Sequence, residues 1–101
     1  MEIHIDTALV VSLKGADNLR EFKTSVALDE THSGAVQTAL QGIAEMDDGH
    51  AWVFVDWLRD AASAHRSSEW DANFSAMLDF AESKGWMKQD PPRVRSHIEW
   101  S

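Results

Sequence analysis

The chain contains no cysteine and no tyrosine, and both absences limit its chemistry. Without cysteine there is no disulfide, no cysteine-ligated zinc, no iron–sulfur cluster and no thiol nucleophile. Without tyrosine the commonest phenolic acid is missing. No stretch approaches the roughly 18 consecutive apolar residues that a membrane span needs, and no basic leader with an apolar segment marks a secretory signal. We therefore expect a cytoplasmic protein without a membrane partner.

Basic residues are also scarce. The chain has 17 Asp and Glu against 9 Lys and Arg, which gives a formal net charge of −8. The excess is regional: residues 28–82 hold eleven acids and two bases, and the rest holds six acids and seven bases. This acidity argues against a general nucleic-acid binder, because phosphate contacts need a clustered cationic face. The small basic stretch near the end consists of Lys84, Lys88, Arg93 and Arg95.

The length of 101 residues suits one compact domain, which we assign to residues 1–101. In the first half, apolar residues at every odd position predict a strand over 3–13. Alternation and β-branched residues favour a second strand over 20–28 after a turn. A helical stripe of Val36, Ala39, Leu40 and Ile43 predicts a helix over 30–46.

In the second half, residues 51–55 read as a short buried strand, and Asp56 as the N-cap of a short helix. A capping box at 68–71 starts the clearest helix, and Gly85 is placed to end it in the left-handed conformation, with Trp86 folding back on its last turn. Residues 93–100 alternate again and predict a final strand.

The expected order is strand–strand–helix–strand–helix–helix–strand. It indicates an α+β fold with a mainly antiparallel sheet of about four strands and helices packed on one face. The other face of such a sheet is either solvated or buried against something. A symmetric dimer is the commonest solution.

Histidine beside carboxylate is the first candidate for chemistry. His4 and Asp6 share the polar face of the first predicted strand, and His97 and Glu99 share that of the last. If the two terminal strands are neighbours, these side chains converge as a general base or a hard-metal site. The simpler interpretation is a solvated face with cross-strand charge pairs. No known metal-ligand spacing or cofactor motif occurs, so we predict neither a metal nor a cofactor.

The other histidines give weaker signals. His32 and His65 lie at the borders of apolar stripes, where packed and hydrogen-bonded histidines are common. His50 follows Asp47-Asp48-Gly49 in a predicted turn, and the spacing of these residues does not match a calcium loop.

Five tryptophans are unusual for this length. Trp70 lies on the stripe of the long helix and belongs to the core. We expect some of the others at an interface or around a pocket, since tryptophan is enriched in binding hot spots. Trp100 is the first interface candidate, and Trp52 and Trp57 are candidate pocket walls. The predicted ligand or interface residues are Trp52, Trp57, Trp86 and Trp100.

These features favour a small non-enzymatic binding or assembly module, homodimeric or docked on a larger protein. One alternative is a small enzyme or ligand-binding protein with a Trp-lined pocket and a His/carboxylate pair. Another is an acidic inhibitor or immunity-type protein for a basic partner. A winged helix over 74–98 is disfavoured by the acidic middle. No nucleophile elbow, zinc-protease motif or phosphate-binding loop occurs, and the sequence leaves open whether the chain is an enzyme.

Overall fold

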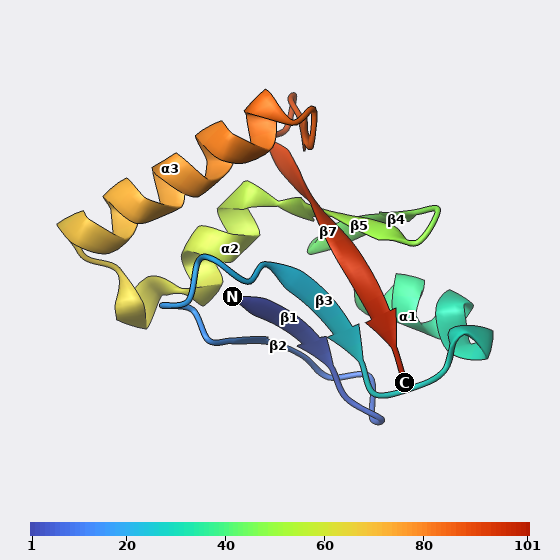
Figure 1. Cartoon of the computed structure of the whole chain (residues 1–101). Helices are drawn as coiled ribbons and strands as arrows, with labels where there is room; N and C mark the ends of the chain where they lie inside the picture. The colour runs from blue at the N-terminus through green and yellow to red at the C-terminus, as the bar shows by residue number, and fades with distance from the viewer.

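Seven strands form one mixed sheet in the computed structural model, which describes residues 1–101, together with three α-helices (Figure 1). Six strands lie in the order β2–β1–β3–β7–β5–β4, and β6 pairs with the first half of β7. β1, β3 and β7 run parallel at the centre, and the other pairings are antiparallel. The strands are β1 (Glu2–Ile5), β2 (Val11–Lys14), β3 (Lys23–Val26), β4 (Ala44–Asp47), β5 (His50–Phe54), β6 (Met87–Lys88) and β7 (Arg93–Trp100). The helices are α1 (Ser33–Ala39), α2 (Val55–Ala61) and α3 (Ser68–Ser83), with 3₁₀ turns at Glu30–His32 and Ser63–His65.

The predicted mainly antiparallel sheet of about four strands is wrong, because the sheet has seven strands and a parallel centre. Where the sequence predicted one strand over 3–13, the chain forms β1 and β2. Asp6 closes the turn between them: its Oδ1 accepts the backbone N–H groups of Ala8 and Val10, both at 2.9 Å. After β2 the chain returns to the starting end of β1, so β3 pairs with β1 in parallel.

The predicted helix over 30–46 is too long. α1 ends at Ala39, and the chain then enters β4. β4 and β5 form a hairpin whose two turn residues, Asp48 and Gly49, have φ angles of 49° and 83°. Two consecutive positive φ angles define the type I′ turn, which matches the twist of a two-stranded ribbon. The prediction missed β4 for this reason: the acidic turn was read as the end of a helix rather than as the tip of a hairpin.

The long helix is confirmed, with its cap one residue earlier than predicted. The Ser67 hydroxyl accepts the backbone N–H of Trp70 at 3.0 Å, which satisfies a free donor in the first turn. At the other end Gly85 has a φ of 78°, and the Trp86 N–H donates to the carbonyl of Ala81 at 2.9 Å. This is the Schellman ending that Gly85 predicted. α2 begins at Val55, directly after β5 and one residue before the predicted cap Asp56.

The core lies between the helices and one face of the sheet, which we call the inner face. Its most buried side chains, none more than 2% exposed, include Ile3, Ile5, Val26, Val36, Leu40, Val53, Leu58, Phe74 and Val94. Two buried polar residues, Thr24 and Ser96, satisfy each other through hydroxyls 2.9 Å apart. Trp70 stacks on Phe74 with ring centroids 4.8 Å apart and donates its indole N–H to the carbonyl of Ala16 at 2.9 Å.

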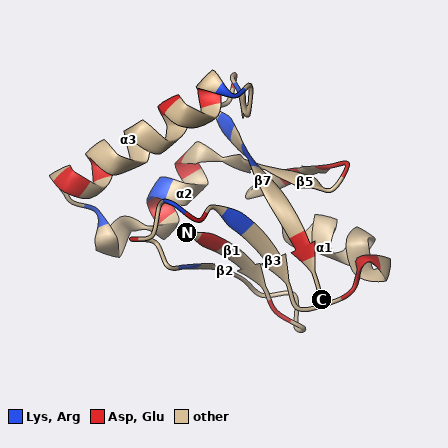
Figure 2. Ribbon diagram, in the orientation of Figure 1, with Lys and Arg blue, Asp and Glu red and all other residues tan.

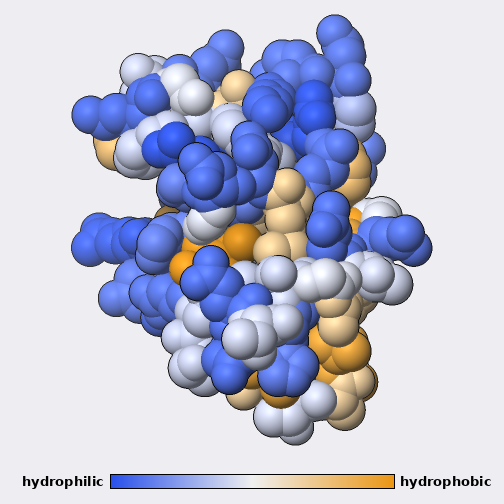
Figure 3. Space-filling view, turned by 90° about the vertical axis from the view of Figure 1, so that its right-hand side faces the viewer, coloured by the Kyte–Doolittle hydropathy of each residue, from blue (hydrophilic) through white to orange (hydrophobic).

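The side of the molecule that carries β4 and α1 is mainly polar. Figure 3 views the molecule from this side, which is largely hydrophilic, with apolar atoms near its middle and toward its lower right. Val10 and Phe80 are the large apolar side chains with the greatest exposure, at 58% and 57%. No helix combines the length and the apolar character needed to cross a bilayer.

Candidate functional site

The face of the sheet opposite the helices, which we call the outer face, is the candidate site. The register places sixteen side chains on it, and none of them is buried. They are Glu2, His4, Ser12, Lys14, Lys23, Ser25, Glu45, Asp47, His50, Trp52, Phe54, Lys88, Arg93, Arg95, His97 and Glu99.

The outer face is nearly balanced in charge although the protein is strongly acidic. Its side chains include four acids and five bases, so the remaining thirteen acids and four bases carry the whole excess of negative charge. In Figure 2 the acids of the long helix and of the β4–β5 hairpin stand apart from the strands at the centre. A second acidic molecule therefore meets less repulsion at the outer face than over the rest of the surface taken together.

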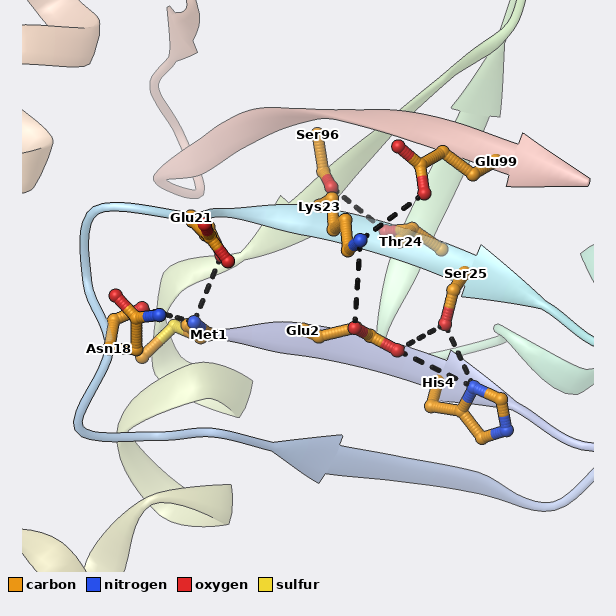
Figure 4. A network of polar contacts seen from close by, with 10 residues as sticks. All are labelled: Met1, Glu2, His4, Asn18, Glu21, Lys23, Thr24, Ser25, Ser96 and Glu99. Carbon is orange, nitrogen blue, oxygen red and sulfur yellow. Dashed lines mark hydrogen bonds and ion pairs between the residues drawn. The ribbon is translucent and has the colours of Figure 1, made fainter.

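A polar network crosses β1, β3 and β7 on this face (Figure 4). The Ser25 hydroxyl donates to the Glu2 carboxylate and lies 2.8 Å from Nδ1 of His4. Lys23 Nζ lies 3.3 Å from Glu99 and 4.0 Å from Glu2. The hydrogen bond from Ser25 lowers the pKa of Glu2, and the hydrogen-bonded Glu99 raises the pKa of Lys23.

The direction of these hydrogen bonds limits what the network can do chemically. Because the Ser25 hydroxyl gives its proton to Glu2, the Nδ1 of His4 has to be the protonated nitrogen to hydrogen bond the same oxygen. The imidazole then donates to the serine instead of accepting its proton. This is the reverse of a nucleophile and its general base, so the network orders three strands rather than activating Ser25.

The predicted His/carboxylate group is brought together only in part. His4 and Glu99 lie on the outer face, but β3 separates their strands, and Ser25 and Lys23 lie between them. Asp6 instead caps the β1–β2 turn. His97 pairs with a different residue, as described below. Sequence reasoning missed Glu2, Lys23 and Ser25, although the alternation within residues 23–26 was enough to place Lys23 and Ser25 on one face.

Two cation–tryptophan pairs lie near each other: Lys88 with Trp52 on the outer face, and Arg95 with Trp86, which precedes β6 and also packs edge to face on Phe80 of α3. Lys88 Nζ lies 4.2 Å from the ring centroid of Trp52, and the Arg95 guanidinium carbon lies 5.3 Å from that of Trp86. Arg95 is directly opposite Trp52 in the β5–β7 register. The spacing is within the range of cation–π attraction. Both tryptophans remain partly exposed.

The other two predicted tryptophans lie elsewhere. Trp57 lines an open hollow of about 390 Å³, but Trp52 is not among its walls. The hollow is lined by Gly42, Phe54, Asp56, Trp57, Asp60, Pro91 and Pro92. Trp100 is partly buried on the inner face and packs against the core. Its strand, β7, is at the centre of the sheet although it is the last strand in the sequence.

A row of three polar residues crosses the other half of the outer face. Asp47, His50 and His97 occupy opposite positions on β4, β5 and β7. The two imidazole rings meet edge to face, with centroids 5.9 Å apart and planes at 66°. No group of three or more His, Cys, Asp or Glu side chains converges closely enough to hold a metal ion within one chain.

No protein-family model matches the chain, and comparisons with curated proteins and with solved structures find no significant match. Function therefore has to be argued from the geometry of the outer face.

Replacing Ser25 with alanine is expected to raise the pKa of Glu2 toward the ordinary glutamate value of 4.5, since the Ser25 hydrogen bond is the strongest influence lowering it. With its folded pKa depressed, Glu2 contributes stability that is fully present above about pH 4.5 and is lost as the pH falls through the folded pKa. NMR titration of the Glu2 carboxyl carbon measures the shift. The Ser12→Ala variant, changed on the other side of His4, serves as the control and keeps the wild-type pKa. An unaltered Glu2 pKa in Ser25→Ala would contradict the assignment.

Proposed function

We propose that the chain is a non-enzymatic assembly module that forms a homodimer through the outer face of its sheet. The observation that carries the proposal is the charge balance of this uncovered face, four acids and five bases on a molecule of net charge −8. Two copies repel each other wherever their acidic surfaces meet. Contact through the balanced face avoids that repulsion.

The composition of the outer face also supports contact with a second copy. In a two-fold dimer the same patch meets itself, so a patch that contains both signs of charge can place its bases against the acids of the other copy. Trp52 and Phe54 supply partly exposed aromatic surface, and aromatic residues are enriched in the hot spots of interfaces.

The two other functions have less support. The hollow beside Trp57 is open, and no histidine lines it. A second hollow, of about 260 Å³, is lined by Trp70, His65 and Asp17, but it is also open to solvent, so neither hollow is the enclosed pocket of a small enzyme. The acids of residues 45–82 come from the β4–β5 hairpin, α2 and α3 (Figure 2). Three of them already pair with bases, namely Glu45 with Arg93, Asp56 with Arg59 and Asp71 with Arg66. This distribution favours the homodimer over an inhibitor of a basic partner.

Charge reversal at one residue tests the dimer. Arg95→Glu places an acid in the middle of the outer face, whereas Arg20→Glu makes the same change in net charge in the exposed loop before β3. Sedimentation equilibrium in EDTA is expected to show a dimer for the wild type and for Arg20→Glu. For Arg95→Glu, the dissociation constant is expected to rise about tenfold or more.

Far-UV circular dichroism and urea unfolding establish that both variants keep the wild-type fold. A wild type that stays monomeric at every concentration, both in EDTA and with zinc, would overturn the proposal. So would equal weakening by the two variants, because the effect would then arise from overall charge and not from the outer face.

A further inference from the structure

We infer that His50 and His97 form one half of a transition-metal site, which the same pair from a second copy completes. The inference rests on the proposed dimer and specifies what joins its two copies. It starts from the placement of the two side chains on neighbouring strands of the outer face.

The strand register holds the two imidazoles together. His50 and His97 are directly opposite each other on the antiparallel strands β5 and β7. The N–H of Ile98 donates to the carbonyl of Gly49 at 3.1 Å, which marks the adjacent 49/98 pair as hydrogen bonded. The 50/97 pair is therefore of the non-hydrogen-bonded kind, in which opposing side chains lie closest. Two rings 5.9 Å apart need only side-chain rotation to turn their nitrogens to one ion.

These two histidines also differ from the other three in their hydrogen bonds. His4 contacts Ser25, His32 contacts Asp29, and His65 contacts Asp17. Neither His50 nor His97 has a side-chain hydrogen bond to another protein group. Their ring nitrogens are free for a ligand, and histidine in the neutral form is the commonest metal ligand.

The chemistry of the pair selects an ion of the zinc, nickel or copper type, because imidazole suits these metals better than the hard cations. Tetrahedral zinc takes four ligands, and one chain supplies two here. No third ligand converges on the pair within the chain. A two-fold axis that passes beside the His50/His97 pair would place these residues of one copy against the same residues of the other, which makes four imidazoles around one ion.

The charged groups around the pair are compatible with a dication. Asp47 is opposite His50 on β4 and adds negative charge beside the rings. Lys23 is held by Glu99 at 3.3 Å, and Arg95 by the ring of Trp86 at 5.3 Å. Each of these two cations therefore interacts with a neighbouring side chain. The carboxylate of Glu99, two residues beyond His97, offsets the positive charge of Lys23.

Titration of the full chain with zinc chloride tests the inference. Calorimetry is expected to give one Zn²⁺ per two chains, and sedimentation equilibrium is expected to show that zinc tightens the dimer about tenfold or more, since the ion binds the dimer but not the monomer. His50→Ala and His97→Ala lose both effects. His65→Ala removes an exposed histidine elsewhere and keeps them.

The EDTA measurements separate this inference from the proposed function. A dimer in EDTA that zinc does not strengthen overturns the metal site and leaves the proposed dimer intact. A chain that is monomeric in EDTA and dimeric only with zinc, in a manner dependent on both histidines, supports the metal site. Zinc bound at one ion per chain, or bound equally by His97→Ala, overturns the inference.

Discussion

Replacing Phe74 with alanine is expected to lower the free energy of unfolding by about 3–5 kcal/mol. Phe74 is 1% exposed and stacks on Trp70, and the Arg59 guanidinium lies 5.4 Å from its ring centroid. It is one of the three residues that α3 buries in the core, with Trp70 and Ala81, so truncation leaves a cavity that neighbouring elements fill only in part. Urea unfolding followed by far-UV circular dichroism measures the loss.

Phe80→Ala on the same helix is the matched control. The side chain of Phe80 is 57% exposed, so we expect its loss to change the free energy of unfolding by only about 0.5–1 kcal/mol. Similar losses for both variants would show that burial does not distinguish these two phenylalanines, and that the described packing of α3 is incorrect.

The buried pair of hydroxyls gives the second large effect. Thr24→Val removes one hydroxyl and leaves that of Ser96 buried without its partner, which is expected to cost about 1–3 kcal/mol. Both side chains lie on the inner face of the neighbouring strands β3 and β7, where they are at most 1% exposed. Equilibrium unfolding in urea measures the change.

The double variant Thr24→Val/Ser96→Ala is expected to be more stable than the sum of its two single changes predicts. Removing both hydroxyls leaves no unsatisfied group, so the penalty that each single variant carries disappears. Strict additivity in this double-mutant cycle would mean that the two hydroxyls do not depend on each other.

The sequence predicted best those elements whose signals are local. α3 has its stripe, its serine cap and the glycine ending within about twenty residues, and β7 alternates over its whole length. The β1–β2 turn had no such signal. Leu9 takes a φ of 65° there without being glycine, and the turn leaves Ile5 and Val11 on the same face, so the alternation continues across it.

The missed strand β4 is a different case, because its signal was present. Asp48-Gly49 between two apolar segments is a strong sign of a hairpin. The helical stripe that ends at Ile43 favours a helix that continues to residue 46, and this predicted helix includes most of the residues that form β4. The parallel pairing of β1 with β3 and of β3 with β7 was out of reach, since it depends on contacts between residues far apart in the sequence.

In the candidate site, too, the sequence predicted the local features but not the contacts between residues far apart in the chain. Alternation alone placed His4, His97 and Glu99 on the polar faces of their strands. It did not say that β3 lies between β1 and β7, and so could not pair His4 with Ser25. It also read His50 as part of a turn, whereas the register makes it the neighbour of His97.

The central place of β7 has a consequence for how the chain folds. The three strands β2, β1 and β3 and the hairpin of β4 and β5 meet only through β7, the last strand in the sequence. Until residues 93–100 dock, the facing edges of β3 and β5 have no partner and offer free backbone groups to other chains. Folding of the sheet therefore depends on contacts that span most of the sequence, which predicts slow assembly and the greatest tendency to aggregate before β7 is in place.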